Sequence, residues 1–161
     1  MANIEDLSDV KSVLDCKASG IGLFRTEFLF MNRNELPGEQ EQYETYKSIA
    51  KSMKGRTVVI RTLDSGADKT TAADKSQATN PALGLRAIRL CLSQPHLFIT
   101  QLRAILKASA FGKIRILIPM LSSLEELKQV KLLIKRAKES LVVENIKFDN
   151  EILIGLSLIH I

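Results

Sequence analysis

The sequence predicts an α/β fold built on a parallel sheet, and two features of the 161-residue chain support this prediction. Segments rich in β-branched and aliphatic residues alternate with longer segments of helical periodicity, which is the order of βα units. The strand segments are almost continuously apolar, as strands are when helices cover a sheet. Two closures fit this pattern, a doubly wound open sheet and a (β/α)8 barrel. The sequence has no internal repeat, linker or glycine-rich dinucleotide turn, so one domain is expected.

The first part of the chain predicts three strands and two helices. A short strand at the start is followed by a helix over residues 5–18, which Gly20 ends. Residues 20–30, "GIGLFRTEFLF", are mostly apolar and predict the second strand. Apolar side chains recur at helical spacing over residues 37–55, and "TVVIRTLD" at residues 57–64 is typical of a β-branched strand.

The middle of the chain predicts a loop and then two consecutive helices. Residues 65–79 are small, polar and aperiodic, which indicates a loop. Asn80 suits an N-cap and Pro81 suits the first helical position, so a helix is expected to begin there and to run through "NPALGLRAIRLCLSQ". A second helix is expected over residues 96–112, where a glycine ends it.

The last part of the chain predicts two more strands separated by one helix. "IRILIPM" at residues 114–120 is an apolar, β-branched run. Ser122 or Ser123 is expected to cap the next helix, and the glutamates of its first turn suit the helix dipole. "EILIGLSLI" at residues 151–159 predicts the last strand. The predicted order is therefore β-α-β-α-β-α-α-β-α-β.

Composition excludes several classes of protein. The chain is 45% hydrophobic and 25% charged, but no apolar run approaches the roughly 20 residues of a membrane span. The first residues lack a signal-peptide pattern, and two cysteines do not make a disulfide framework, so a cytoplasmic protein is expected. The net charge is +5, but the lysines and arginines are spread along the chain, mostly among glutamates on helical segments. Aromatic residues make up only 5% of the chain. Neither membrane insertion nor nucleic-acid binding is predicted.

Two arginines stand where strands are expected to end. Arg25 interrupts an apolar run, Arg61 follows "TVVI", and each is followed by a threonine. Ligands of parallel α/β folds bind at the carboxyl ends of the strands, and a guanidinium binds carboxylate or phosphate through two parallel hydrogen bonds. Both arginines are therefore candidates for binding one anion. The alternative is that each pairs with a nearby acid, Arg25 with Glu27 and Arg61 with Asp64.

Other polar side chains are weaker candidates. Arg86 and Arg89 stand near the start of an expected helix, and Arg86 is placed to reach the same face, although a solvated helical arginine is the alternative. Asp64 and Asp68 are loop acids of the kind that solvent usually covers. Four more side chains are expected to have no chemical role: His96, His160, Cys16 and Cys91. The histidines lack metal-ligand partners at a usable spacing, and the cysteines are expected to be small core residues on helices.

Five stretches, taken together, resemble one known family. In chain order they read "GIGLFRTEFLFMNRNELPGEQEQYETYK", "VVIRTLDSGADK", "NPALGLRAIR", "QLRAILKASAFGKIRILIPM" and "SLEELKQVK". They resemble Enzyme I of the bacterial sugar phosphotransferase system, the phosphoenolpyruvate-protein phosphotransferase, over about residues 3–155. The related pyruvate phosphate dikinase and phosphoenolpyruvate synthase share this domain plan, but "FRTEFLFM" and the "EQYETYK" helix are more similar to Enzyme I.

This resemblance implies a partial (β/α)8 barrel, with roughly the first five strands and their helices in this chain. In the family, the barrel binds phosphoenolpyruvate and Mg²⁺ and forms a homodimer. Arg25 and Arg61 match the motifs that hold two of the family's substrate arginines, so both are expected to bind phosphoenolpyruvate. That role would explain an arginine inside so apolar a segment.

The same resemblance identifies what the 161 residues lack. The family's two Mg²⁺ ligands, the cysteine that protonates the enolate and the phosphorylated histidine have no match here, so no catalytic residue and no metal ligand are expected in this chain. Residues 1–155 are expected to be the N-terminal part of the phosphoenolpyruvate-binding barrel. Residues 156–161, "LSLIHI", are expected to be a non-native or truncated tail.

The expected function is therefore that of a fragment. The parent enzyme would transfer the phosphoryl group of phosphoenolpyruvate to one of its own histidines and then to a phosphocarrier protein for sugar uptake. The 161-residue chain alone is expected to be inactive. Two alternatives stay open: a truncated, non-catalytic barrel that serves as a binding or dimerisation module, and a fragment of a dikinase or synthase relative.

Overall fold

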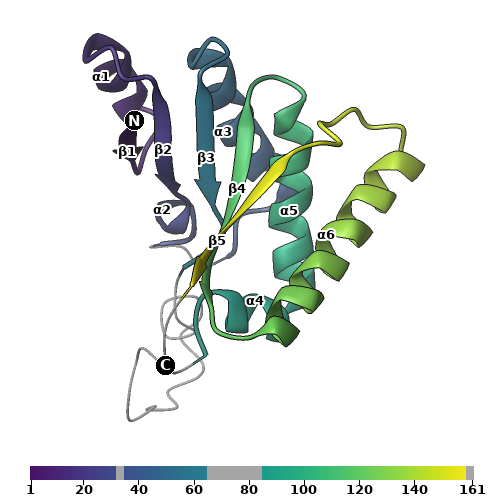
Figure 1. Cartoon of the computed structure of the whole chain (residues 1–161). Helices are drawn as coiled ribbons and strands as arrows, with labels where there is room; N and C mark the ends of the chain where they lie inside the picture. The colour runs from purple at the N-terminus through teal and green to yellow at the C-terminus, as the bar shows by residue number, and fades with distance from the viewer. Residues whose placement is uncertain (32–34, 65–84, 159–161) are drawn as a thin grey trace.

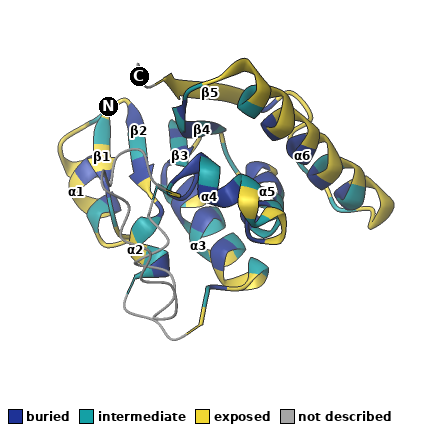
Figure 2. Ribbon diagram, turned by 90° about the horizontal axis from the view of Figure 1, so that it is seen from below, coloured by how far each residue is buried: buried dark blue, intermediate teal, exposed yellow. Residues whose placement is uncertain are grey.

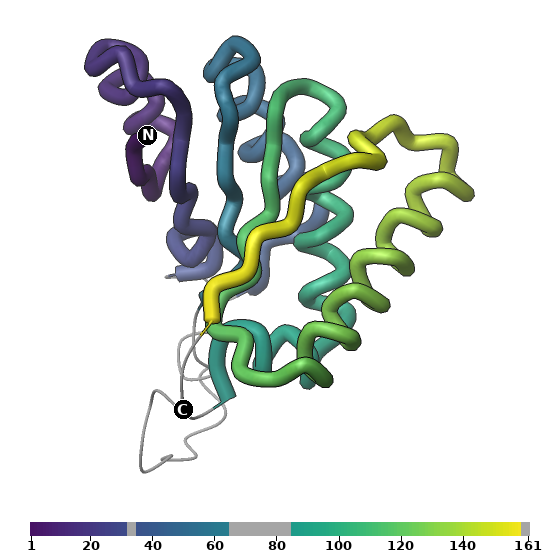
Figure 3. Tube along the Cα trace, in the orientation of Figure 1, coloured from purple at the N-terminus to yellow at the C-terminus, as the bar shows by residue number. Residues whose placement is uncertain are grey.

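The computed structural model describes residues 1–31, 35–64 and 85–158, and its five strands form one parallel sheet. The strands lie side by side in chain order, as Figures 1 and 3 show. Their bounds are β1 Ala2–Ile4, β2 Gly20–Arg25, β3 Thr57–Arg61, β4 Ile114–Leu121 and β5 Leu153–Leu158. The helices between them are α1 Asp9–Asp15, α2 Glu27–Phe30, α3 Glu39–Ser52, α4 Ile88–Ser93, α5 Pro95–Ser109 and α6 Leu124–Val143.

The long helices lie on one side of the sheet. Figures 1 and 2 show α3, α5 and α6 on the same face, and α5 packs against both α3 and α6. A doubly wound sheet carries helices on both faces, whereas a (β/α)8 barrel keeps them all outside its strands. The strand order and the one-sided helices therefore confirm the prediction of a partial barrel and reject the doubly wound alternative. None of the helices in the described ranges is long and apolar enough to span a bilayer.

The core lies between the sheet and these helices. Phe24, Ile60 and Ile116 are register partners on three adjacent strands, and all three are fully buried. Burial of each such side chain contributes about 1.5–3 kcal/mol. Because side chains alternate along a strand, the residues that follow them, among them Arg61 and Leu117, face the opposite side of the sheet. This second face corresponds to the interior of a barrel.

β5 is the most exposed part of the sheet. All six of its residues are exposed, although four of them are leucine or isoleucine. β5 pairs with β4 along one edge, and no other strand among the described residues lies at its second edge. The strand continues from Leu153 past Gly155 to Leu158. The expected boundary at residue 155 and the non-native tail stay predictions.

The strand predicted over residues 20–30 is too long. β2 ends at Arg25, and Thr26 has helical backbone angles (φ −75°, ψ −12°) that lead into α2. The apolar run after Thr26 forms the short helix α2 and not a buried strand. Phe30 is buried in it, but Phe28 is 47% exposed. A continuous apolar run does not distinguish these two cases.

Two other predictions on helices need correction. The first helix is α1, much shorter than residues 5–18, because the Asp9 carboxylate accepts the backbone N–H groups of Glu5 and Asp6 and so holds a turn ahead of it. Cys16, expected in the core, is exposed at the end of α1, whereas Cys91 is buried as expected. The predicted loop at residues 65–79 and the helix start at Asn80 and Pro81 lie outside the described residues.

The helix expected through residues 80–94 begins only at Ile88 in the described residues, because Ala87 ahead of it has a φ of 49° that is not helical. Most other elements agree with the predictions. α3, α5, β4 and β5 each fall within the predicted ranges or within a residue or so of them. Of the two serines proposed to cap α6, Ser123 does so: its hydroxyl accepts the N–H of Glu126 at 3.1 Å. The Glu126 carboxylate accepts the N–H of Ser123 in return, at 3.3 Å, which completes a capping box.

Candidate functional site at the carboxyl ends of the strands

The two predicted site arginines end adjacent strands. Arg25 is the last residue of β2, Arg61 is the last residue of β3, and the two are register partners. Neighbouring strands lie about 4.8 Å apart, so the two backbones are adjacent at this edge. Figure 1 shows the strands pointing toward this end of the sheet, where α2 and α4 also lie. The side chains of Arg25 and Arg61, however, contact different acids.

Arg61 lies between two carboxylates. Its Nη2 donates to Glu27 Oε1, and its Nη1 lies 3.0 Å from Asp64 Oδ2. The Arg61 side chain is 22% exposed, and both acids are less exposed still. Asp64 Oδ1 lies in turn 3.5 Å from Arg86 Nη2, at ion-pair range but without a hydrogen bond. Glu27, Arg61, Asp64 and Arg86 therefore form one row of alternating charges, called the charge row below.

The charge row is incompletely satisfied. Several buried side-chain atoms have no hydrogen-bond partner among the described residues, and all of them belong to this row or to Thr62, the next residue along the chain: Glu27 Oε2, Arg61 Nε, Thr62 Oγ1, Asp64 Oδ1 and Arg86 Nε. Each unsatisfied buried polar group costs about 1–3 kcal/mol, so native proteins contain few of them. Two of these atoms are guanidinium donors, which can bind an anion.

Arg25 is held more loosely than Arg61. Its Nη1 donates to Glu5 Oε1 at 2.6 Å, and both side chains are more than two-fifths exposed. Exposed pairs of this kind contribute at most about 1 kcal/mol, so little is lost when such a pair exchanges its partner. A cavity of about 370 Å³ between β1 and α1 includes Glu5 and Arg25 in its lining. Arg25 is therefore accessible and can be redirected at small cost.

The pairings differ in part from the sequence-based alternatives. Asp64 pairs with Arg61 as proposed. Glu27 pairs with Arg61 and not with Arg25, because the chain turns into α2 between Arg25 and Glu27 and carries Glu27 toward β3. Arg25 instead reaches Glu5, at the end of β1.

Arg86 reaches the face on which Arg61 lies and is not a solvated helical arginine. It precedes α4 and joins the charge row through Asp64. The next residue, Ala87, is buried with a φ of 49° and a ψ of −127°, a conformation that costs a non-glycine residue energy. Arg89 contacts Ser122 at 3.1 Å and Glu126 at 3.4 Å, at the start of α6. No local pattern predicts that Arg86 meets Asp64 or that Arg89 meets Ser122.

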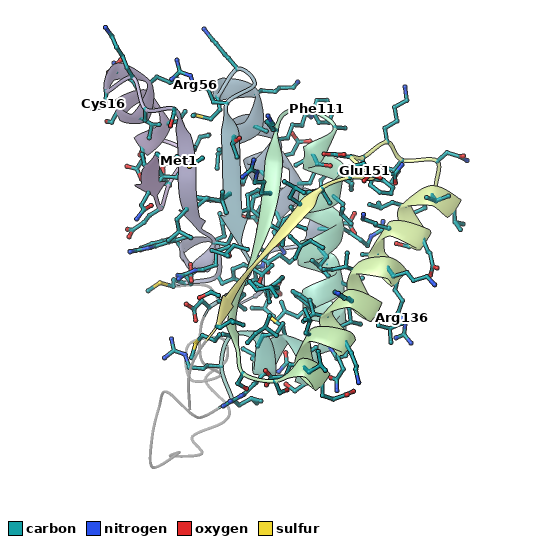
Figure 4. The ribbon with its side chains drawn as sticks, viewed as in Figure 1. Met1, Cys16, Arg56, Phe111, Arg136 and Glu151 are labelled. Carbon is teal, nitrogen blue, oxygen red and sulfur yellow. The ribbon has the colours of Figure 1, made fainter. Side chains whose placement is uncertain are left out.

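The described residues offer few ligands for a metal ion. Within the parts of the chain that the structure describes, no three His, Cys, Asp or Glu side chains come together as a metal-binding group. The two carboxylates of the charge row are each engaged by Arg61. His96 is exposed near the start of α5, and His160 lies outside the described residues. Cys16 lies near the opposite end of the strands, as Figure 4 shows. The Mg²⁺ of the resemblance stays a prediction.

Fold and site together define a class of protein: a parallel α/β chain of the barrel type with an arginine-rich site at the carboxyl ends of its strands. Comparison with known proteins then identifies the family. Residues 1–159 match the family model described as the PEP-binding domain of PEP-utilising enzymes, where PEP is phosphoenolpyruvate. The chain belongs to this family.

Curated relatives agree with this assignment. The phosphoenolpyruvate-protein phosphotransferase of Cupriavidus necator is 50% identical over 159 residues. Those of Mycoplasma capricolum and Staphylococcus epidermidis are 48% and 46% identical over 156 residues. Each alignment covers 96% of this chain and 27% of the relative. The chain therefore spans about a quarter of the length of these relatives.

Proposed function

We propose that this chain supplies part of the phosphoenolpyruvate site of a phosphoenolpyruvate-protein phosphotransferase. The observation that supports this most directly is the incompletely satisfied charge row, with buried guanidinium donors of Arg61 and Arg86 that lack partners in the described ranges. The row lies at the carboxyl ends of barrel strands, where enzymes of this architecture bind their substrates. The names of the relatives indicate which anion is meant.

The chemistry of phosphoenolpyruvate suits such a site. The molecule carries a phosphate and a carboxylate, and each can accept two parallel hydrogen bonds from a guanidinium. Phosphoryl transfer asks a protein mainly to position the phosphorus and to neutralise charge. Arg25 and Arg61 would bind the substrate, and Arg86 would add a third cation beside Arg61. For this, Arg61 exchanges at least one of its carboxylate contacts for the ligand.

The wider reaction is part of the same proposal. The phosphoryl group of phosphoenolpyruvate would pass to a histidine of the enzyme and then to a phosphocarrier protein that serves sugar uptake, with Mg²⁺ and a homodimer as in the resembling family. The described residues provide no group of three ligands that could hold Mg²⁺. The 161-residue chain is proposed to bind substrate without catalysing the transfer.

A binding titration tests the proposal. The 161-residue chain is titrated with phosphoenolpyruvate by isothermal calorimetry, with inorganic phosphate and pyruvate as partial ligands. Arg61→Met is expected to weaken binding at least about tenfold, since a charge-assisted hydrogen bond contributes about 1.5–3 kcal/mol. Arg61→Lys, which keeps the charge but loses the planar fork, is expected to be intermediate. Arg86→Met is the second variant if Arg61→Met fails to fold.

The matched control is Arg136→Met. Arg136 is exposed on α6 and projects away from the sheet, as Figure 4 shows, so its loss removes one positive charge without touching the site. Its affinity for phosphoenolpyruvate is expected to equal that of the parent chain. Failure of the parent chain to bind phosphoenolpyruvate, or equal losses in Arg136→Met and Arg61→Met, would contradict the proposal.

A further inference from the structure

A glutamine is buried behind the two strand ends. Gln101 of α5 is 1% exposed, yet both ends of its amide group are hydrogen-bonded. Its Oε1 accepts the backbone N–H of Leu63 at 2.9 Å. Its Nε2 donates to Thr26 Oγ1 at 3.2 Å and to Tyr46 Oη at 3.3 Å. A buried amide without such partners would be costly, so the placement of this side chain is set by these three bonds.

Two of the three partners of Gln101 stand within two residues of the site arginines. Thr26 is the next residue after Arg25, and Leu63 is the second residue after Arg61. The Thr26 hydroxyl accepts from Gln101 and donates to the backbone carbonyl of Arg61 at 2.9 Å, so it joins the ends of β2 and β3. Gln101 therefore connects both strand ends to one helix.

The other side of this network is anchored in α3. Tyr46 is fully buried, and its hydroxyl accepts from Gln101 and donates to Gln42 Oε1 at 3.1 Å. Gln42 Nε2 donates to the Pro37 carbonyl at 2.9 Å. Each of these donors and acceptors has one consistent direction, so no proton is shared or missing. A fully satisfied buried network of this kind fixes a single arrangement of the elements it connects.

The contrast with the charge row is informative. The side-chain polar atoms of Gln101, Thr26 and Tyr46 all have hydrogen-bond partners, whereas each of the four side chains of the charge row has one buried atom without a partner among the described residues. We infer that Gln101 is a positioning residue for the anion site: through Thr26 and the amide of Leu63 it fixes the ends of β2 and β3, and so sets where the Arg61 guanidinium lies. This inference rests on the proposed function.

The first test needs no ligand. The order parameter of the Arg61 Nε–Hε group is measured by ¹⁵N relaxation in the 161-residue chain. Gln101→Met removes all three bonds at nearly constant volume, and Thr26→Val removes the bridging hydroxyl, so both are expected to lower the order parameter. Thr26→Ser keeps the hydroxyl and is expected to restore it. An Arg61 group that is equally ordered in all variants would overturn the inference.

The second test is affinity for phosphoenolpyruvate, measured well below the unfolding temperature of every variant. Gln101→Met and Thr26→Val are each expected to weaken binding about fivefold or more, and the double variant to lose less than the sum of the two single losses, since the two side chains share one bond. Leu133→Ala is the control, because Leu133 is buried on α6 away from this network and its loss destabilises the chain without moving Arg61.

The outcomes separate the inference from the proposed function. If the parent chain binds phosphoenolpyruvate and Gln101→Met binds it as tightly as Leu133→Ala does, the positioning role is wrong and the proposed function stands. If the parent chain does not bind phosphoenolpyruvate, the proposed function fails, and the order of Arg61 alone decides whether Gln101 positions it. Rescue by Thr26→Ser in both measurements supports the inference, because a purely structural role would follow stability instead.

Discussion

Arg103 connects three helices on the outer face of the sheet, and its replacement by methionine gives a sharp test of this packing. Its Nε lies 2.7 Å from Glu39 Oε2, at the start of α3. Its Nη2 lies 2.8 Å from Glu144 Oε2, just after α6, and its Nη1 donates to Ser140. The side chain itself belongs to α5 and is only 12% exposed. Methionine keeps the aliphatic packing and removes every polar contact.

The expected loss can be worked out bond by bond. Hydrogen bonds to charged groups contribute about 1.5–3 kcal/mol when they are partly buried, as the bond to Glu39 is. Glu39 keeps its contact with Lys107 at 3.1 Å, which offsets part of the loss, and the exposed Glu144 is rehydrated. We expect Arg103→Met to lower the free energy of unfolding by about 2 kcal/mol, or the melting temperature by about 4–8 °C for a chain of this size.

The assay is urea unfolding followed by far-ultraviolet circular dichroism. Lys135→Met is the matched control, because Lys135 forms an exposed pair with Glu139 at 3.7 Å on α6 and is expected to lose no more than about 0.5 kcal/mol. Glu39→Gln combined with Arg103→Met should cost less than the sum of the two single changes. Equal losses in Arg103→Met and Lys135→Met would refute the idea that the three helices are held together by this arginine.

Three further predictions concern a cap, pH and thiol reactivity. Ser123→Ala removes the capping box of α6 and should cost about 1 kcal/mol in a thermal melt, whereas Ser123→Asp should retain most of it. Burial raises the pKa of Glu39, but hydrogen bonds from Arg103 and its neighbouring lysine outweigh this and hold the pKa below its usual value. The ionised Glu39 carboxylate therefore adds to the free energy of unfolding above its unfolded pKa near 4.5, and this stability is lost as the pH falls through the lower folded pKa. Acid unfolding should shift to higher pH in Glu39→Gln. Burial raises the pKa of Cys91 to about 12, so an aromatic disulfide reagent should modify the exposed Cys16 first, and fast modification of both thiols in the native chain would contradict this.

Much of the fold could be predicted because its signals are local. β3 is a β-branched run, β4 is an apolar run rich in isoleucine, and α3 and α6 carry helical periodicity together with a stop or a cap. The pair of Arg61 with Asp64 was also foreseeable, since the two residues stand three apart where a strand ends. Local spacing failed at Glu27, because the chain changes from strand to helix one residue earlier and sends that carboxylate to a different strand.

The rest of the candidate site depends on contacts between distant parts of the chain. Gln101 meets Thr26 across 75 residues and Leu63 across 38. Helical spacing from Leu97 and Ile105 places it on the buried face of α5, but that spacing does not specify its hydrogen-bond partners. Arg86 reaches Asp64 from the start of α4, at a position that the preceding residues do not specify by pattern. Such residues are found only when the sheet and its helices have been placed in space.

The order of the strands has a consequence for how the chain acquires its structure. Each strand pairs with the one that precedes it in the sequence, so every new strand finds its partner already formed as the chain leaves the ribosome. Each closure joins one strand to the next through one or two helices, and the entropic cost of closing such a segment grows only slowly with its length. Folding can therefore proceed by accretion, one unit at a time from the N-terminus, and the charge row is assembled only when Arg86 joins a sheet edge that β2 and β3 have already built.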